Sequence, residues 1–291
     1  MGLAYNDFNL LELGRIIALE TLGVLEGIKK VSRFNIGADN LQNFKKRMTD
    51  LGLECEESDF RIMQTRSDKG MINVDITKFT EDEKGDYFLY VSKEKKKAKK
   101  AKEYDNIKTN KFSHQKLASL LGYPRCCIEF YEKHRPEAIK IRRDDYTLIS
   151  LRNSEGFIFP YYTNNIMRYF ESGLLTFFPC SYKCEKAIDF GKKMFKAIKK
   201  CSPEYADYLK KELRRTMIYT DFEGVHQLKK SVLKDNILTY SDVESTQKNQ
   251  LHKLLKKADE IKIINHFLVK IMKNGKILKV LKKNSGILIF E

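Results

Sequence analysis

Two short stretches, far apart in the chain, each place a proline beside two cysteines, and this pairing constrains the fold more than any other feature. The first, residues 121–127, reads LGYPRCC, and the second, residues 177–184, reads FFPCSYKC. Proline is well tolerated in the first turn of a helix, where its missing N–H would have been unpaired. Apolar residues follow both stretches at helical spacing. Each stretch is therefore predicted to begin a helix, where unpaired backbone N–H groups favour thiolate over thiol.

The cysteines of these stretches are the predicted ligands of a metal: Cys126, Cys127, Cys180 and Cys184. On a helix, Cys180 and Cys184 would share one face because they are four residues apart. The adjacent Cys126 and Cys127 would point about 100° apart, unless the first of them precedes the helix. Thiolates prefer soft or borderline metals, so the expected cofactor is zinc or an iron–sulfur cluster. The spacing matches no common zinc-ribbon template.

Aromatic side chains flank the cysteines and are predicted to shield the cofactor from solvent. The residues selected for this role are Tyr123, Phe178 and Tyr182, together with Phe130. His114 and His134 are further candidate ligands, although a lone histidine is more often an ordinary surface or core residue.

Three other interpretations of the cysteines stay open. They can form a redox pair, because cysteines with a lowered pKa at helix starts carry out disulfide exchange. They can form a structural disulfide, which is uncommon in the cytosol but known in hyperthermophiles, or they can simply pack in the core. Cys55 and Cys201 stand apart and are predicted to be core residues. A radical S-adenosylmethionine triad is excluded because Ala187 occupies its third position.

Residues 1–110 predict an N-terminal α+β unit. Apolar residues at helical spacing indicate one or two helices within residues 8–33, and another that starts at about Ala38 and ends before Gly52. Alternating and β-branched residues then predict an antiparallel meander. Its strands are expected at 60–64, 72–76 and 87–91, and its turns at 67–70 and 81–85.

A lysine-rich run at residues 93–102 predicts a basic helix that Ser92 caps and that lies on the sheet through Ala98 and Ala101. Such a run is usually a solvated surface. The formal net charge of +16 nevertheless suits a polyanionic partner such as RNA, although lysine-rich composition also marks proteins from hot environments. The predicted phosphate contacts are Lys95, Lys96, Lys99 and Lys100, with Lys229 and Lys230 from the C-terminal strands.

Residues 111–215 predict a helical unit that carries the cysteine stretches and packs on the first unit. Capping residues and prolines mark where its helices are expected to begin. These positions are Ser113, the first cysteine pair, Pro136, Thr163, the second cysteine pair and Ser202–Pro203, with Gly122 and Gly173 as ends.

Residues 216–291 predict a small β-rich C-terminal extension. Its strands are expected at 216–222, 237–240 and 286–290, with a helix at 251–261. Asn274–Gly275 is the strongest short signal for a hairpin, and it predicts that residues 268–281 fold back there. The predicted fold class of the whole chain is therefore α+β.

Several classes of function find no support in the sequence. It contains no Gly-rich phosphate loop, no nucleophile elbow and no HExxH helix. No apolar run approaches the roughly 20 residues of a membrane span, so no membrane partner is expected. Because the first residues lack a basic region followed by an apolar one, the expected location is the cytoplasm.

Three segments together are similar to a known family: YVSKEKKKAKKAKE, LASLLGYPRCCIEFYEKH and FFPCSYKCEKA. They resemble an uncharacterised, largely archaeal domain-of-unknown-function family, numbered 483, over about residues 10–200. The residues that carry the resemblance are Gly122, Pro124, Cys126, Cys127, Pro179, Cys180 and Cys184. The resemblance implies that the cysteine stretches form the site, and it implies no reaction.

The sequence as a whole favours a cytosolic cysteine-cluster protein that binds a metal or iron–sulfur centre and acts on or with nucleic acid, as an enzyme or accessory of RNA modification. One alternative is a non-catalytic, zinc-stabilised module that binds nucleic acid. The other is a thiol oxidoreductase. The sequence assigns neither a reaction nor a substrate, so it leaves open whether the protein is an enzyme.

Overall fold

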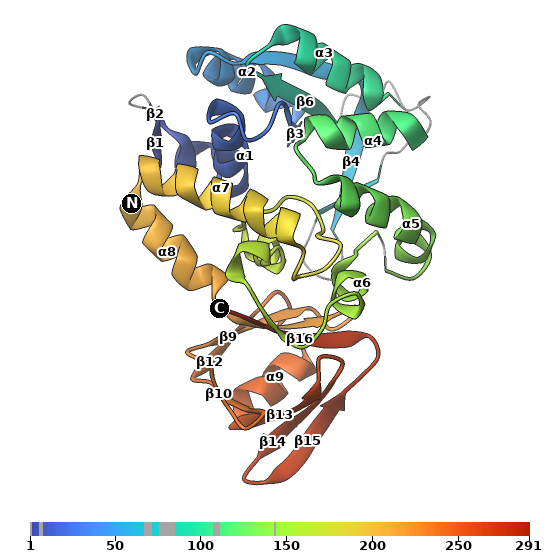
Figure 1. Cartoon of the computed structure of the whole chain (residues 1–291), viewed down its shortest axis with the longest axis vertical. Helices are drawn as coiled ribbons and strands as arrows, with labels where there is room; N and C mark the ends of the chain where they lie inside the picture. Colours follow the sequence, from blue (N-terminus) through green and yellow to red (C-terminus); the bar gives the residue numbers. More distant parts are fainter. Residues whose placement is uncertain (1, 6–7, 67–71, 76–84, 107–110, 143) are drawn as a thin grey trace. The chain divides into compact units, whose positions relative to one another are not determined.

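The structure is a computed structural model that describes residues 2–5, 8–66, 72–75, 85–106, 111–142 and 144–291 (Figure 1). It is an α+β protein, as predicted, in which helices and antiparallel sheets occupy different parts of the chain. The chain divides into two compact units. Unit 1 comprises residues 1–65, 72–129 and 192–206, and unit 2 comprises residues 66–71, 130–191 and 207–291.

The sheet of unit 1 has four strands in the order β3-β6-β4-β5. They are β3 (Ser32–Ile36), β4 (Glu54–Arg66), β5 (Ile72–Asp75) and β6 (Asp86–Ser92), and a short antiparallel pair, β1 (Ala4–Tyr5) with β2 (Phe8–Asn9), precedes them. The small antiparallel sheet is confirmed, but the meander is wrong because β6 pairs with both β3 and β4. Residues 88–92 of β6 are all buried, as a central strand requires. The predicted turn residues 67–70 and 81–84 and the strand end at residue 76 lie outside the described residues.

Helices cover this sheet. They are α1 (Arg15–Leu25), α2 (Leu41–Asp50), α3 (Lys95–Tyr104) and α4 (Lys111–Leu120), with 3-10 turns η1 (Leu10–Leu13) and η2 (Ala38–Asn40). The predicted basic helix is α3, and its Ala98 and Ala101 are fully buried beside Tyr90. The hydroxyl of Ser92 accepts the N–H of Glu94 just before α3 begins. Ser113 lies inside the first turn of α4 rather than before it.

Four helices follow α4 along the chain. They are α5 (Arg125–Arg142), α6 (Thr147–Arg152), α7 (Glu185–Cys201) and α8 (Pro203–Leu213). The prediction that Pro136 begins a helix is wrong, because α5 runs through it. Pro136 has no N–H to donate, so one hydrogen bond within the helix is missing. Two residues later, Ala138 is fully buried in a cluster with Phe130, and this packing stabilises the helix beyond the proline. Helix α8 begins at Pro203, as predicted.

The helix predicted from Thr163 to Gly173 does not form. This segment contains only 3-10 turns, η3 (Tyr161–Thr163) and η4 (Ile166–Phe170). The Thr163 hydroxyl donates outside the segment, to the Tyr182 carbonyl at 2.8 Å. The buried Asn164 amide donates to the Leu213 carbonyl at 2.7 Å. These two bonds hold the segment to other parts of unit 2, and they favour the irregular path over a regular helix.

Two five-stranded sheets complete unit 2. The first has the order β12-β9-β8-β16-β7 and the second β10-β11-β13-β14-β15. In chain order the strands are β7 (Ile158–Phe159), β8 (Thr216–Thr220), β9 (Val225–Lys229), β10 (Val232–Lys234), β11 (Ile237–Thr239), β12 (Asp242–Ser245), β13 (Glu260–Asn265), β14 (Leu268–Lys273), β15 (Lys276–Leu281) and β16 (Ser285–Phe290). The hairpin turns at Asn274–Gly275 as predicted, and both residues have positive φ, 49° and 74°.

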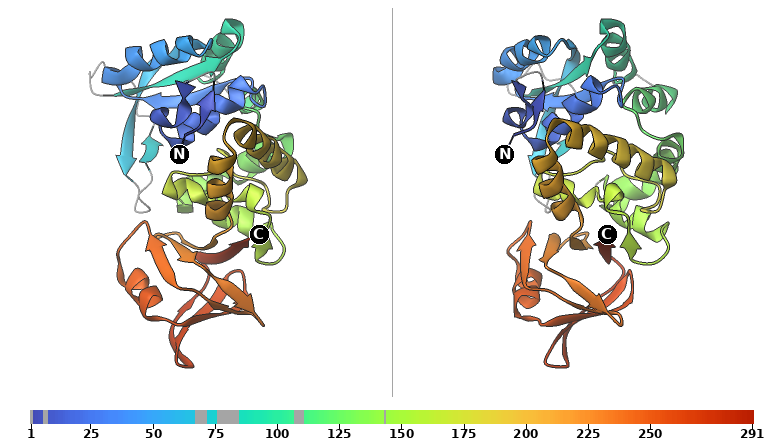
Figure 2. Two further views of the ribbon diagram at one scale, coloured as in Figure 1. Left: turned by 90° about the vertical axis from the view of Figure 1, so that its left-hand side faces the viewer. Right: turned by 60° about the vertical axis from the view of Figure 1, so that its left-hand side comes forward.

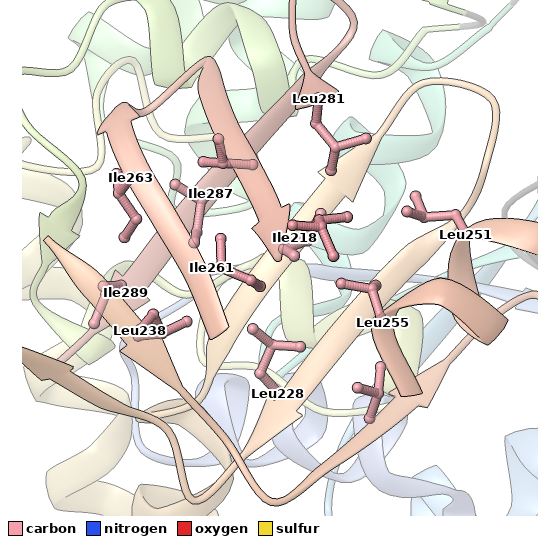
Figure 3. Packing of buried hydrophobic residues seen from close by; sticks show 13 residues of the cluster. Ile218, Leu228, Leu238, Leu251, Leu255, Ile261, Ile263, Leu281, Ile287 and Ile289 are labelled. Carbon is pink, nitrogen blue, oxygen red and sulfur yellow. The ribbon is translucent and has the colours of Figure 1, made fainter. Parts of the chain in front are cut away.

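An aliphatic cluster fills the space between these strands and α9 (Gln250–Lys257) (Figure 3). Leu251 and Leu255 of α9 point into the cluster toward Ile218 and Leu228. Ile261 was expected on the same helical stripe, but α9 ends at Lys257 and Ile261 lies in β13, where it still enters the cluster. Figure 2 shows α9 and these strands from two further sides.

Candidate metal centre

Four cysteines converge in the structure, as the sequence predicted. They are Cys126, Cys127, Cys180 and Cys184, and their sulfur atoms all lie within 4.8 Å of one another. The sulfurs of Cys126 and Cys127 are 4.0 Å apart. Cys127 is buried, and the other three are partly buried. The group can therefore hold a metal ion.

Helix α5 positions the first two sulfurs. The Pro124 carbonyl accepts the N–H groups of Cys127 at 2.9 Å and Ile128 at 3.0 Å, so a helix begins directly after the proline and carries the first cysteine pair in its first turn, as predicted. Gly122, with φ of 81°, makes the turn before it. One turn beyond the cysteines, Phe130 packs in a cluster that includes Phe178 and Cys180.

The second cysteine stretch is a loop, and the prediction that Cys180 and Cys184 share one face of a helix is wrong. Helix α7 begins only at Glu185, and the Cys184 carbonyl accepts its first helical bond, from the Ile188 N–H at 2.9 Å. The reason lies in the carbonyl groups of Pro179 and Cys180. Both accept hydrogen bonds from side chains elsewhere in the chain, and these bonds favour the loop over a helix that would begin at Pro179.

Three short polar side chains at the end of α6 supply bonds to this loop. The Ser150 hydroxyl donates to the Pro179 carbonyl at 2.7 Å, and the Asn153 amide donates to the Cys180 carbonyl at 2.7 Å. The Ser154 hydroxyl accepts the Tyr182 N–H at 2.9 Å. These three residues were not predicted from the sequence. Their spacing of three and four residues, which puts polar groups on one helix face, is the signal that would have found them.

The predicted aromatic residues lie in different surroundings. Phe178 is held between the Tyr146 ring, at 5.1 Å, and the Arg168 guanidinium, 3.8 Å from its centroid. Tyr182 is fully buried, and its ring contacts those of Phe159 and Phe290. Tyr123 packs in unit 1, with its ring 5.6 Å from the Lys29 ammonium.

Arg168, which stacks on Phe178, belongs to a buried polar group. Its guanidinium lies 3.8 Å from the Asp145 carboxylate, and the Tyr169 hydroxyl donates to the same carboxylate. Burial raises the pKa of Tyr169, so its hydroxyl stays protonated and remains a donor. This polar group fixes the position of the Arg168 guanidinium, which covers one face of Phe178, two residues before Cys180.

The remaining cysteines and the candidate histidines are not part of the group of converging sulfurs in the described residues. Burial raises the pKa of Cys55 to about 12, and it also raises the pKa of Cys201. The His134 ring packs on Phe130 at 4.6 Å, and burial is the main cause of its lowered pKa. His114 lies on α4.

The lysines predicted to contact nucleic acid fall into two groups. The first group lies on α3 and consists of Lys95, Lys96, Lys99 and Lys100. All four are exposed, and they have no carboxylate partner among the described residues. Lys229, at the end of β9, instead lies 3.3 Å from Glu244 and 3.6 Å from Asp242. Lys230 follows it in a turn with φ of 49°.

Among the described residues, no helix combines the length and the apolar character that a membrane crossing requires. No curated protein and no solved structure matches the chain. One family model matches part of the chain, and the matched part includes all four converging cysteines. The match starts and ends further along the chain than the resemblance over about residues 10–200. Residues 91–214 match the family described as "Protein of unknown function (DUF483)".

Proposed function

We propose that the four cysteines bind one Zn²⁺ ion as a structural site, and that the protein is a zinc-stabilised binding module. The spacing of the sulfurs carries this proposal. Zinc binds cysteine sulfur at 2.3 Å in tetrahedral geometry, which puts neighbouring sulfurs about 3.8 Å apart. The observed 4.0 Å and the upper limit of 4.8 Å are close to that spacing. Four thiolates leave no open position for substrate, which is typical of a structural rather than a catalytic zinc site.

The same spacing favours a single ion over the other interpretations. In an iron–sulfur cluster each cysteine binds an iron of the cluster, so the ligand sulfurs must surround a larger body than one ion. Thiol–disulfide exchange needs only an attacking thiolate and its partner, and it gives no reason for four sulfurs to converge. The N-terminus of α5 also supports the proposal, because its partial positive charge stabilises the excess negative charge of a tetrathiolate zinc site.

Elemental analysis of the full chain, purified without oxygen, tests this proposal. The expected result is one zinc per chain and a colourless protein. Replacement of zinc by Co²⁺ should give the visible absorption of a tetrahedral thiolate complex. Iron with broad visible absorption would overturn the proposal in favour of a cluster. Metal-free protein in which all four thiols react with a thiol reagent would overturn any metal role.

We propose as a second function that α3 binds the phosphate backbone of single-stranded RNA. The observation that supports it is the contrast among the lysines of this helix. Lys97 and Lys102 form ion pairs with Glu94 and Asp59, whereas four other lysines on the exposed side have no such partner among the described residues. Unpaired lysines on a helix whose opposite face is anchored by alanines are available for phosphate contacts.

Fluorescence anisotropy with a single-stranded RNA oligonucleotide, measured over a range of salt concentrations, tests this second function. The variant carries Lys95→Ala, Lys96→Ala, Lys99→Ala and Lys100→Ala. Each lost phosphate contact on a single strand reduces the log–log salt slope by about 0.7, so the slope should fall by about 3. The control removes four exposed lysines from α7 and α8, through Lys193→Ala, Lys196→Ala, Lys199→Ala and Lys211→Ala. Equal slopes in the two variants would contradict the assignment to α3.

A further inference from the structure

Unit 2 contains an open hollow of about 440 Å³ that no part of the cysteine site lines. Its walls come from α5, α6, the β13–β14 turn and the segment between β15 and β16. The lining residues are Arg142, Leu148, Arg152, Asn265, Phe267, Leu268, Lys282 and Lys283. A volume of this size is in the range of small-molecule sites.

Two arginines of the hollow are fixed in place by carboxylates. Arg142 pairs with Asp221, and their side chains are only 10% and 1% exposed. The Arg152 guanidinium forms two hydrogen bonds to Glu137, at 2.6 and 3.0 Å. The Nε of Arg142 is buried and has no hydrogen-bond partner among the described residues; it lies 3.8 Å from Glu137. Because these carboxylates hold both guanidinium groups, the positive charge of the two arginines has a fixed position beside the hollow.

The hollow carries more positive than negative charge. Lys282 and Lys283 are exposed at its rim and have no carboxylate partner among the described residues. Four cationic side chains therefore line the hollow, while the arginines contact two carboxylates, Glu137 and Asp221. The difference is two positive charges, which matches the charge of about −1.5 to −2 that a phosphate monoester carries at pH 7.

The other walls of the hollow are apolar and aromatic. Leu148 and Leu268 supply aliphatic surface. The Phe267 ring packs against the His266 ring in an edge-to-face contact, with the ring centroids 4.4 Å apart. The side-chain oxygen Oδ1 of Asn265 accepts the Phe267 N–H at 2.9 Å, which leaves the side-chain NH₂ group of Asn265 as a donor. An aromatic face beside fixed cations suits a ligand that has both a charged group and a flat ring.

We propose that this hollow binds a small phosphate monoester whose organic part is flat and partly apolar, as in a nucleoside monophosphate. The phosphate lies toward Arg142, Lys282 and Lys283, and the ring packs on Phe267. Phosphate oxygens accept charge-assisted hydrogen bonds from guanidinium and ammonium groups, which are the stronger kind. This inference is independent of the zinc site and of α3.

Isothermal titration calorimetry of the full chain with adenosine 5′-monophosphate, adenosine and inorganic phosphate tests the proposal. The nucleotide should bind with a stoichiometry of one, and each of the two fragments more weakly. Lys282→Ala with Lys283→Ala should weaken nucleotide binding by about 10- to 100-fold, since two charged contacts are lost. The matched control, Lys273→Ala with Lys276→Ala, removes two exposed lysines from the hairpin of the same unit and should leave binding within about twofold.

A second variant tests the aromatic wall. Phe267→Ala should weaken binding of the nucleotide and leave that of inorganic phosphate unchanged. Equal affinity for the nucleotide and adenosine would overturn the proposal, as would equal losses in the two double-lysine variants. Binding of single-stranded RNA that depends on Lys282 and Lys283, with no binding of the nucleotide, would assign the surface to RNA and overturn the small-ligand proposal.

Discussion

A Cys127→Ser variant is expected to lose its zinc and to unfold at a markedly lower temperature than the wild-type chain. Cys127 is 2% exposed, and a serine hydroxyl at this place does not replace a thiolate as a zinc ligand. Structural zinc contributes folding free energy directly, about 10–16 kcal/mol in isolated zinc-finger peptides. This chain also has large apolar cores, so a smaller loss of at least about 3 kcal/mol is expected. For a chain of 291 residues, that loss corresponds to roughly 5 °C in the melting temperature.

The other cysteines provide matched controls for this experiment. Cys55→Ser and Cys201→Ser change the same chemical group outside the cluster and should retain one zinc per chain. Removing zinc from the wild type with a chelator should reproduce the lower melting temperature of Cys127→Ser. Full zinc content in Cys127→Ser, or a melting temperature no lower than that of Cys55→Ser, would rule out the proposed site.

Acid should destabilise the protein through His226 in the range between pH 6.5 and 4. This side chain is fully buried in β9, and burial lowers its pKa to about 4. The neutral ring donates from Nε2 to the Glu223 carbonyl, at 3.1 Å, and its Nδ1 lies 2.8 Å from the Ser245 hydroxyl. The unfolded chain binds the proton near pH 6.5 and the folded chain only near 4. Stability is therefore complete above pH 6.5 and falls with pH, by about 3 kcal/mol at pH 4.

A His226→Gln variant separates this contribution from that of the carboxylates. Glutamine can donate to a carbonyl and accept from a hydroxyl, but it does not titrate. Urea unfolding of both proteins, measured from pH 7.5 to pH 4, should show a flatter dependence in the variant, by up to about 1.4 kcal/mol per pH unit. Two parallel curves would show that His226 does not titrate differently in the folded and unfolded states.

The convergence of the cysteines could be predicted from the sequence, but the path of the second stretch could not. A helix begins directly after Pro124, and the Pro124 carbonyl accepts the first hydrogen bonds of α5. Pro179 has the same local signal, yet its carbonyl accepts the Ser150 hydroxyl, and the chain stays a loop until Glu185. The difference comes from a residue 29 positions away. Local propensity does not report such a contact.

Among the strands, too, only the features that depend on local sequence could be predicted. The hairpin at Asn274–Gly275 was predicted because its backbone requires positive φ, which is a local property. Ile261 was misplaced because isoleucine can bury its side chain equally well from a helix or from a strand, and only the end of α9 decides between them. The place of β6 between β3 and β4 likewise depends on pairing with distant residues.

Helix α6 has only six residues, and a peptide of that length does not hold a helical shape in water by itself. Its order must come from its neighbours on both sides. On one side, Ser150 and the adjoining Asn153 donate hydrogen bonds to the cysteine loop. On the other side, Leu148 and Arg152 line the hollow of unit 2. A substitution that unfolds α6 would therefore disturb the cysteine loop and the hollow at the same time.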